Sequence, residues 1–411
     1  MLSMLIDKSI LEWSNAMTRY LSAREVAEHL GISVPTVYAY VSRGLLHSEP
    51  AGAHAHRYLF DEVEQLKLRR EGRRNPASVA AGALHWGTPV LDSAITLIDN
   101  QQVYYRGFDV RELASSASIE EVASLIWVGD RQQSQQLWGD LPALNIPQLP
   151  DLPLLEQFVV ALAMVGSNDH AAFDQRPQGL QRTAVRVVQL LISVAAKRPL
   201  QGPIVAQLAE AWQIPPNLQP LLNAALIVSA DHELNVSSFT ARCVASAGTT
   251  LYAVVSAGLA ALGGVHHGKQ SELSELLLDE LLRSPDIYAA LAQKLRLGQP
   301  IPGFGHPMYP NGDPRGKVLL DLIRQLAPQC SNDIDRIIQA VYELLGDHPT
   351  IDFGLAWVGR VLNLPLGSAM SLFALGRSVG WIGHALEQYS DARLIRPRAR
   401  YTGERPNIIK I

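Results

Sequence analysis

The stretch Ser229-Ala-Asp-His-Glu-Leu-Asn235 precedes the uncharged run Cys243–Gly264. A second polar stretch, Gly263-Gly-Val-His-His-Gly-Lys-Gln-Ser-Glu272, begins with the last two glycines of that run. The uncharged run is rich in Ala, Gly, Ser and Thr, and it is long enough to span a bilayer. Arg242 and His266 bracket it, and a helix that is apolar all round can equally be the central element of a large soluble core. We therefore expect a buried helix here, with a polar, histidine-containing segment at each end.

The composition of the whole chain is that of a large globular protein. Its 411 residues are 47% hydrophobic and 18% charged, which indicates two or three domains. The net charge of −4 argues against binding of nucleic acid or anionic membranes by the protein as a whole. Asp7, Lys8 and Glu12 interrupt any apolar region of a secretory signal. Cys243 and Cys330 are too few for a disulfide framework, so we expect a location in the reducing cytoplasm.

Residues 1–75 are expected to form a separate small domain. Ser22-Ala-Arg-Glu25 is a capping box that begins a first helix. After the turn Gly31-Ile32-Ser33, Ser33 can cap a second helix, whose Val34, Val37 and Val41 share one face. Two short helices around a three-residue turn that contains glycine form a helix-turn-helix. A further helix is expected over Asp61–Glu71.

This order of elements resembles the winged helix-turn-helix of the MerR and excisionase class. The resemblance implies that Thr36, Tyr40 and Arg43 face a major groove and that the 47–57 loop is a wing over phosphates. DNA is therefore one expected partner through residues 19–75. The alternative is a helical module that serves oligomerisation or is a remnant, because residues 1–75 contain ten Lys and Arg against nine Asp and Glu and so have little net positive charge.

The rest of the chain follows the linker Asn75-Pro76 and is mostly helical in pattern. The exception is Ala94–Arg106, where two alternating β-prone runs flank Asp99-Asn100 and predict a hairpin. Proline-rich breaks at 147–153 and 214–219 separate helices. The fold class is therefore mainly α with a short β-hairpin, preceded by the small helix-turn-helix domain.

Polar residues beside glycines are concentrated in the C-terminal half, where they form candidate sites. Histidines next to glycines can approach a ligand closely. Gathered arginines match the geometry of a substrate with several carboxylates. A lone Asp among apolar residues can act as a general base. Besides the two stretches quoted first, the segments are Pro302–Arg315, Ile351–Gly354, Phe373–Arg377 and Arg393–Arg398.

Metal and nucleophile sites are the natural competitors. The histidines that could in principle gather around zinc are His232, His266, His267 and His306. They lack the HExxH spacing and have no thiol nearby in sequence, so we expect no metal. A nucleophilic triad is equally unsupported, since the chain has no GxSxG motif.

These segments, in this order, resemble citrate synthase over residues 80–411. Tyr105-Arg-Gly-Phe-Asp-Val is similar to the family's YRGYDI stretch, and Ala230-Asp-His-Glu-Leu-Asn-Val-Ser matches ADHELNAS. Gly303-Phe-Gly-His, Asp313-Pro-Arg and Arg396-Pro-Arg match GFGH, DPR and the terminal RPR. The resemblance implies an acyltransferase of the tricarboxylic acid cycle that condenses acetyl-CoA with oxaloacetate to give citrate and CoA.

The resemblance also implies roles for individual residues. His267 would stabilise the enol of the acetyl thioester, Asp352 would remove the methyl proton, and His306 would polarise the ketone of oxaloacetate. The residues implied to hold carboxylates are His232, Arg315, Arg377 and Arg396. Arg396 would reach into the partner subunit's site, which implies a homodimer.

The implied architecture is a large domain at 76–267 and 357–411, with a small domain at 268–356 that closes over both substrates. No permanently bound cofactor is implied, because acetyl-CoA or propionyl-CoA is a co-substrate. With propionyl-CoA the product would be 2-methylcitrate, and one extra methylene changes discrimination by only about 1–3 kcal/mol. A third interpretation is a DNA-binding regulator that uses the same body to sense acyl-CoA or oxaloacetate.

The chain departs from the family pattern at three places, one of which is the region 165–230, expected to be shorter than usual where the dimer helices or a CoA-contacting loop would lie. The family usually has His-Gly-Gly-Ala-Asn-Glu where this chain has His267-Gly-Lys-Gln-Ser-Glu272, so Lys269 puts a bulky cation next to the thioester site. An arginine often follows the histidine of GFGH, but here the residue is Pro307. Every acid–base candidate is retained, which favours an active enzyme.

Overall fold

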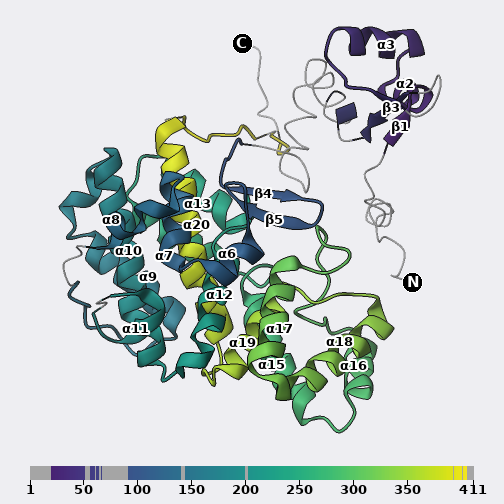
Figure 1. Cartoon of the computed structure of the whole chain (residues 1–411). Coiled ribbons are helices and arrows are strands. Elements are labelled where there is room, and N and C mark those ends of the chain that lie inside the picture. Colours follow the sequence, from purple (N-terminus) through teal and green to yellow (C-terminus); the bar gives the residue numbers. More distant parts are fainter. Residues whose placement is uncertain are drawn as a thin grey trace. The chain divides into compact units, whose positions relative to one another are not determined.

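The computed structural model describes residues 20–50, 56–60, 62–63, 66, 91–139, 144–199, 202–391, 393–399 and 401–404. The chain divides into two compact units, Met1–Asp92 and Ser93–Ile411. The first has a small sheet and short helices, and the second is mainly helical, as predicted (Figure 1). The predicted domain boundary at residues 75/76 lies outside the described residues.

The first unit contains the predicted helix-turn-helix. Its elements are β1 (Tyr20–Ser22), α2 (Ala23–Leu30), α3 (Val34–Ser42), β2 (Glu49–Pro50) and β3 (His56–Leu59), with an antiparallel sheet in the order β1-β3-β2. β2 and β3 pair antiparallel within the segment 47–57 that was predicted to form the wing, and residues 51–55 between the strands are not described. Of the predicted helix Asp61–Glu71 only residues 62–63 and 66 are described, and they are helical.

The caps of the two helices differ from each other. The capping box of α2 is confirmed, because Ser22 Oγ accepts from Glu25 N at 3.3 Å and the Glu25 carboxylate accepts from Ser22 N at 2.7 Å. The predicted cap by Ser33 is wrong in its chemistry. Ser33 occupies the N-cap position of α3, but its hydroxyl bonds the Thr36 hydroxyl at 2.8 Å instead of a backbone N–H.

The second unit begins with the predicted hairpin. β4 (Thr96–Asp99) and β5 (Gln102–Tyr105) pair antiparallel around Asn100 and Gln101, which both have positive φ. The turn is therefore one residue later than Asp99-Asn100. A third strand, β6 (Phe108–Asp109), pairs with β5 and was not predicted.

Helices build the remainder of the second unit. In chain order the α-helices are α6 (Val110–Ser116), α7 (Ile119–Val128), α8 (Ser134–Trp138), α9 (Leu154–Gly166), α10 (Pro177–Ala196), α11 (Ile204–Ala211), α12 (Gln219–Ser229), α13 (Val236–Ser246), α14 (Leu251–Leu262), α15 (Lys269–Arg283), α16 (Ile287–Arg296), α17 (Pro314–Leu326), α18 (Ser331–Leu345), α19 (Ile351–Val361) and α20 (Ser368–Asp391). The short 3-10 segments are η1 (Arg131–Gln133), η2 (His170–Phe173), η3 (Pro216–Leu218) and η4 (Pro328–Cys330). Figure 1 shows α15 to α18 in green on one side, while the yellow α20 runs among the teal helices.

The single helix predicted over Cys243–Gly264 is wrong. The structure has two helices there, α13 and α14, and residues 247–250 separate them. Gly248 in this break has a φ of +76°, a conformation that ends a helix and that glycine adopts without strain. In the described part of the chain, no helix is both long and apolar enough to cross a membrane.

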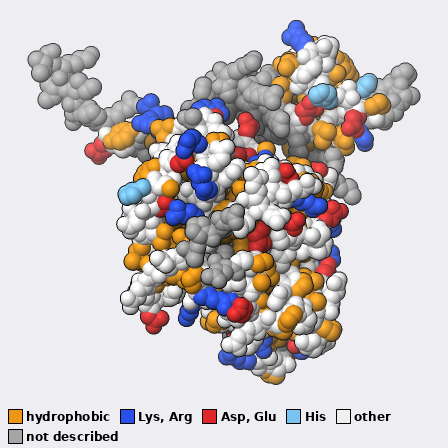
Figure 2. Space-filling view, turned by 60° about the vertical axis from the view of Figure 1, so that its left-hand side comes forward, with side chains coloured by type: hydrophobic (Ala, Val, Ile, Leu, Met, Phe, Trp, Pro, Cys, Tyr) orange, Lys and Arg blue, Asp and Glu red, His pale blue; other side chains and the backbone are white. Residues whose placement is uncertain are grey.

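α20 packs unusually close to the end of α12. A Cβ at Gly376 would lie 2.4 Å from the Leu226 carbonyl oxygen, and one at Gly380 would lie 2.3 Å from the Ala230 carbonyl oxygen. Glycine at both positions therefore lets α20 run directly beneath residues 229–231, which begin the first histidine segment. On the face drawn in Figure 2, acidic and basic side chains are interspersed.

We expect Gly380→Ala to lower the free energy of unfolding by about 1–3 kcal/mol, because the added methyl group would overlap the carbonyl oxygen of Ala230, which cannot move without its backbone. Gly263→Ala is the matched control, since its Cβ would meet atoms no closer than 3.7 Å. Thermal unfolding of the two variants measures the difference. Equal stability of both would contradict the close α20–α12 packing.

Candidate active site

The structure brings six of the seven predicted site residues to one region of the second unit. They lie in turns or helices that converge there. They are His232 (turn before α13), His267 (turn before α15), His306 (loop before α17), Arg315 (first turn of α17), Asp352 (first turn of α19) and Arg377 (middle of α20). The seventh, Arg396, is exposed on residues 393–399, after α20.

Two glycines shape the loop that holds His306. Gly303 and Gly305 have φ values of +86° and +74°, in the left-handed region that favours glycine. A Cβ at Gly303 would also lie 2.7 Å from Ser274 Oγ. The loop is tied to the segment before α19, because Thr350 N donates to the Gly303 carbonyl at 2.9 Å and Gly305 N donates to the His348 carbonyl at 2.9 Å. The GFGH sequence therefore places His306 beside the helix that bears Asp352.

Asp313 fixes Arg315 by a two-pronged ion pair. Arg315 donates from Nε to Oδ1 at 3.0 Å and from Nη2 to Oδ2 at 2.7 Å, and both side chains are buried. The same carboxylate caps α17 through Arg315 N and accepts from Ile351 N at 3.2 Å. Asp313 thus joins the starts of α17 and α19. Within the DPR sequence, the Asp is the helix cap and the Arg carries the guanidinium that this cap binds.

Tyr309 links two of the histidines and was not predicted. Its hydroxyl is 2.6 Å from Nε2 of His232, and its ring lies 5.0 Å from the His306 ring, centroid to centroid. The Arg315 guanidinium carbon lies 5.8 Å from the centre of the Tyr309 ring. Its only signal in the sequence was its place in the glycine- and proline-rich stretch Pro302–Arg315.

The three histidines are uncharged at neutral pH. Burial, and then the positive charges of Arg377 and Arg315, lower the pKa of His267 to about 4. Burial and Arg315 lower the pKa of His306 to about 4 as well, and the pKa of His232 is held well below its usual range for the same reasons. Met308 N donates to Nδ1 of His306 at 3.2 Å, which puts the ring proton on Nε2. His306 is therefore a neutral donor.

Arg377 is fully buried, and only part of its hydrogen-bonding capacity is used within the described residues. Its Nε donates to the Ser229 carbonyl at 2.7 Å, while Nη1 and Nη2 have no protein partner. Its guanidinium carbon lies 4.6 Å from the centre of the Phe373 ring. Burial lowers the pKa of Arg377 to about 10, so the group stays charged at neutral pH. Unsatisfied, buried guanidinium donors are costly unless an anion binds them.

Asp352 is held by two hydroxyl groups that the sequence did not indicate. Ser271 Oγ donates to Oδ1 at 2.5 Å, and Thr350 Oγ1 donates to Oδ2 at 3.2 Å. Burial raises the pKa of Asp352, although the Ser271 hydrogen bond and Arg315 act in the opposite direction. A desolvated carboxylate of this kind is a stronger base than one in water.

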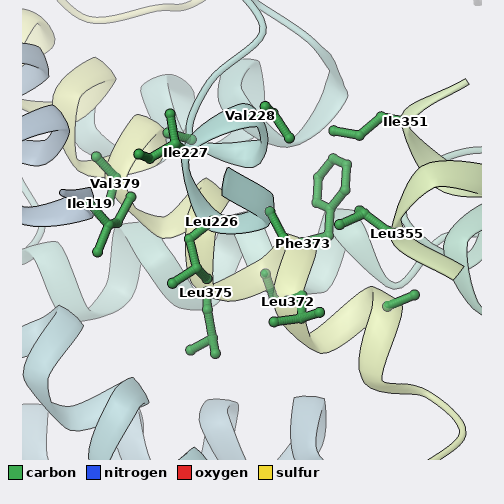
Figure 3. Close-up of a cluster of buried hydrophobic side chains, with 14 of the residues drawn as sticks. Ile119, Leu226, Ile227, Val228, Ile351, Leu355, Leu372, Phe373, Leu375 and Val379 are labelled. Carbon is green, nitrogen blue, oxygen red and sulfur yellow. The ribbon is translucent and has the colours of Figure 1, made fainter. Parts of the chain in front are cut away.

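The floor beneath these groups is apolar. Figure 3 shows the Phe373 ring of α20 beside Leu355 and Ile351 of α19, and all three side chains are buried. Such surroundings exclude water and strengthen electrostatic interactions. Lys269, the bulky departure, forms an ion pair with Glu272 at 2.7 Å on α15, and Pro307 is exposed. No three His, Cys, Asp or Glu side chains in the described part of the chain are grouped so as to hold a metal ion.

Comparison with known sequences links both units to protein families. A family model described as the C-terminal domain of citrate synthase matches residues 83–398, and a helix-turn-helix domain model matches residues 20–71. Citrate synthase 2 of Bacillus subtilis is 29% identical over 77% of this chain and 94% of its own length. The citrate synthase of Haloferax volcanii is 30% identical, over 78% and 95%. The 2-methylcitrate synthase of Shewanella oneidensis is 28% identical, over 74% and 89%.

Solved structures have the same fold. The citrate synthase of Thermotoga maritima superposes with a TM-score of 0.67 at 25% identity, over 77% of this chain and 94% of that one. The citrate synthase of Thermoplasma acidophilum, solved with carboxymethyl coenzyme A and oxaloacetate, has a TM-score of 0.66 at 22% identity, over 78% and 95%.

Proposed function

The chain belongs to the citrate synthase family, and we propose from that premise that its second unit condenses acetyl-CoA with oxaloacetate to give citrate and CoA. The observation that carries the proposal is the pair of buried guanidinium groups beside three neutral imidazoles. Arg377 has two buried nitrogens without a partner among the described residues, and Arg315 lies near it with its charge already paired to Asp313. A small dicarboxylate with a ketone group suits this arrangement.

Substrate binding is assigned to His232, Arg315 and Arg377. Guanidinium groups bind carboxylates by paired N–H donors, and in a site without bulk water each such contact is strong. His232 is held by Tyr309, so its ring has a fixed orientation before the substrate arrives. Binding of the dianion also relieves the cost of the unpaired nitrogens of Arg377.

Enolisation is assigned to Asp352 and His267. Asp352 takes a proton from the methyl group of the acetyl thioester, and His267 donates to the thioester oxygen as the enolate forms. Ser237 Oγ lies 2.8 Å from Nε2 of His267. In this structure Ser237 Oγ donates to Asn235 Oδ1 at 2.8 Å, and that oxygen also accepts from two backbone N–H groups. Donation by His267 to the thioester oxygen requires its ring hydrogen on Nδ1, so in the proposed step the Ser237 hydroxyl turns from Asn235 to Nε2 of His267.

Carbon–carbon bond formation is assigned to His306. Its Nε2–H polarises the ketone of oxaloacetate as the enolate carbon attacks it. Water then hydrolyses the citryl thioester, which releases citrate and the CoA thiol. The chemistry uses acetyl-CoA as a substrate and needs no permanently bound cofactor.

Assembly and substrate choice are part of the same proposal. Arg396, exposed in the single chain, fits a homodimer in which it completes the partner's site. Residues 268–356 would form the domain that closes over the substrates. Acetyl-CoA is the expected donor, and propionyl-CoA is the alternative because a 2-methylcitrate synthase is among the relatives. Free thiols at Cys243 and Cys330 fit the reducing cytoplasm.

Asp352→Asn should lower kcat for thiol release from acetyl-CoA about 10²–10⁴-fold, since it removes the base. In the wild type, kcat should rise with pH through the raised pKa of Asp352, because the carboxylate must be ionised while the histidines are already neutral above about pH 4. The control is Asp335→Asn, which alters an exposed carboxylate on α18. Thiol release is measured with acetyl-CoA and propionyl-CoA. Folded wild type that releases no thiol from either donor would contradict the enzyme assignment and favour the regulator.

The first unit is assigned a DNA-binding role as a second function. The order α2, turn, α3 and the antiparallel β2–β3 pair has the form of a winged helix-turn-helix, and Arg43 is exposed at the end of α3. In this assignment α3 enters the major groove, with Thr36, Tyr40 and Arg43 toward the bases.

Selection of the full-length protein against random duplex DNA should yield a preferred sequence whose affinity falls steeply with salt. Arg43→Ala should weaken binding to that sequence by about tenfold or more. Arg24→Ala, on the exposed face of α2, is the matched control and should leave the sequence preference intact. Failure to retain any duplex at physiological salt would refute this second function.

A further inference from the structure

Ser271, the third residue of α15, is a buried donor to the proposed base. Its hydroxyl hydrogen bonds Oδ1 of Asp352 at 2.5 Å, and its side chain is completely buried. The two residues are 81 positions apart, so the contact exists only because α15 packs against α19. A hydroxyl has one proton, and here that proton is directed to the carboxylate.

The two oxygens of Asp352 are held unequally. Oδ1 has the short bond from Ser271, whereas Oδ2 has a 3.2 Å bond from Thr350 Oγ1. The same Thr350 oxygen also accepts from Asp352 N, because Thr350 is the N-cap of α19. A donor that stabilises one oxygen as an anion disfavours protonation there. The incoming proton should therefore bind Oδ2.

We propose that Ser271 is a positioning residue for the condensation. Its hydroxyl anchors Oδ1 of Asp352, so that Oδ2 takes the substrate proton. This rests on the proposed function. In the step, the C–H bond of the acetyl methyl group breaks and the O–H bond at Oδ2 forms. The electron pair of the C–H bond becomes the enolate, which His267 stabilises. Ser271 donates its hydrogen bond throughout and transfers no proton.

Ser271 stands where the family pattern His-Gly-Gly-Ala-Asn-Glu has asparagine. Serine and asparagine side chains both carry a hydrogen-bond donor, so the departure exchanges one donor group for another. The other charged groups that face Asp352 are Arg315 and Asp313 at the start of α17 and Arg377 on α20. None of them is altered when Ser271 is replaced, so a change in the titration of Asp352 reports on the lost hydroxyl.

The experiment compares Ser271→Ala with Ser271→Asn and with the control Ser274→Ala. Ser274 is one turn further along α15, is also buried, and donates to the Gln270 carbonyl instead of the site. We expect Ser271→Ala to lower kcat about tenfold to a hundredfold while KM for oxaloacetate stays within about twofold. The acid limb of its kcat–pH profile should move to higher pH, because a hydrogen bond to the charged form is lost.

Acetyl-CoA deuterated at the methyl group provides a second readout. The isotope effect on kcat should rise in Ser271→Ala, since proton removal becomes slower, and Ser271→Asn should restore both the rate and the pH profile. Ser274→Ala should retain the wild-type profile.

Each outcome discriminates. An inactive wild type would reject the proposed function itself. With an active wild type, the proposal about Ser271 alone is overturned if Ser271→Ala keeps the wild-type kcat and pH profile. It is also overturned if Ser271→Ala and Ser274→Ala lose equal activity with unshifted profiles, or if Ser271→Asn recovers nothing.

Discussion

The buried ion pair between Arg315 and Asp313 is the interaction on which the site depends. Asp313 caps α17, binds the guanidinium with both oxygens and accepts from the first backbone N–H of α19. One carboxylate thereby fixes the helix that carries Arg315 relative to the helix that carries Asp352. Breaking such a pair would leave an uncompensated buried charge, so these two helices are held together wherever the pair is intact.

Burial and the nearby arginines together determine the state of the histidines. Burial, and then the positive charges of the guanidinium groups, lower the pKa values of His267 and His306, so both imidazoles are neutral. For His306, the backbone N–H of Met308 selects which ring nitrogen carries the hydrogen. Cationic arginines that bind carboxylates, and neutral histidines that donate to carbonyl oxygens, are what a condensation of a keto diacid with a thioester requires.

The features that the sequence predicted correctly are formed by residues that are close together in the chain. The capping box of α2, the hairpin and the segments that contribute His232, His306 and Arg315 all lie in short motifs, and the structure contains them. The sequence did not reveal that Tyr309 lies beside His232 or that Ser271 lies beside Asp352. These contacts join residues 77 and 81 positions apart, which only the packing of the fold brings together. The break between α13 and α14 was missed because an uncharged run with Gly248 inside it has the same composition as one continuous buried helix.

The central claim is that the buried arginines and neutral imidazoles form a site for a dicarboxylate. Calorimetric titration of the wild-type protein with oxaloacetate and with pyruvate, without acyl-CoA, tests it directly, because pyruvate lacks one carboxylate. A charge-assisted contact is worth about 1.5–3 kcal/mol, so oxaloacetate should bind at least about tenfold more tightly than pyruvate. Equal affinity for the two keto acids, or binding of neither, would contradict the account.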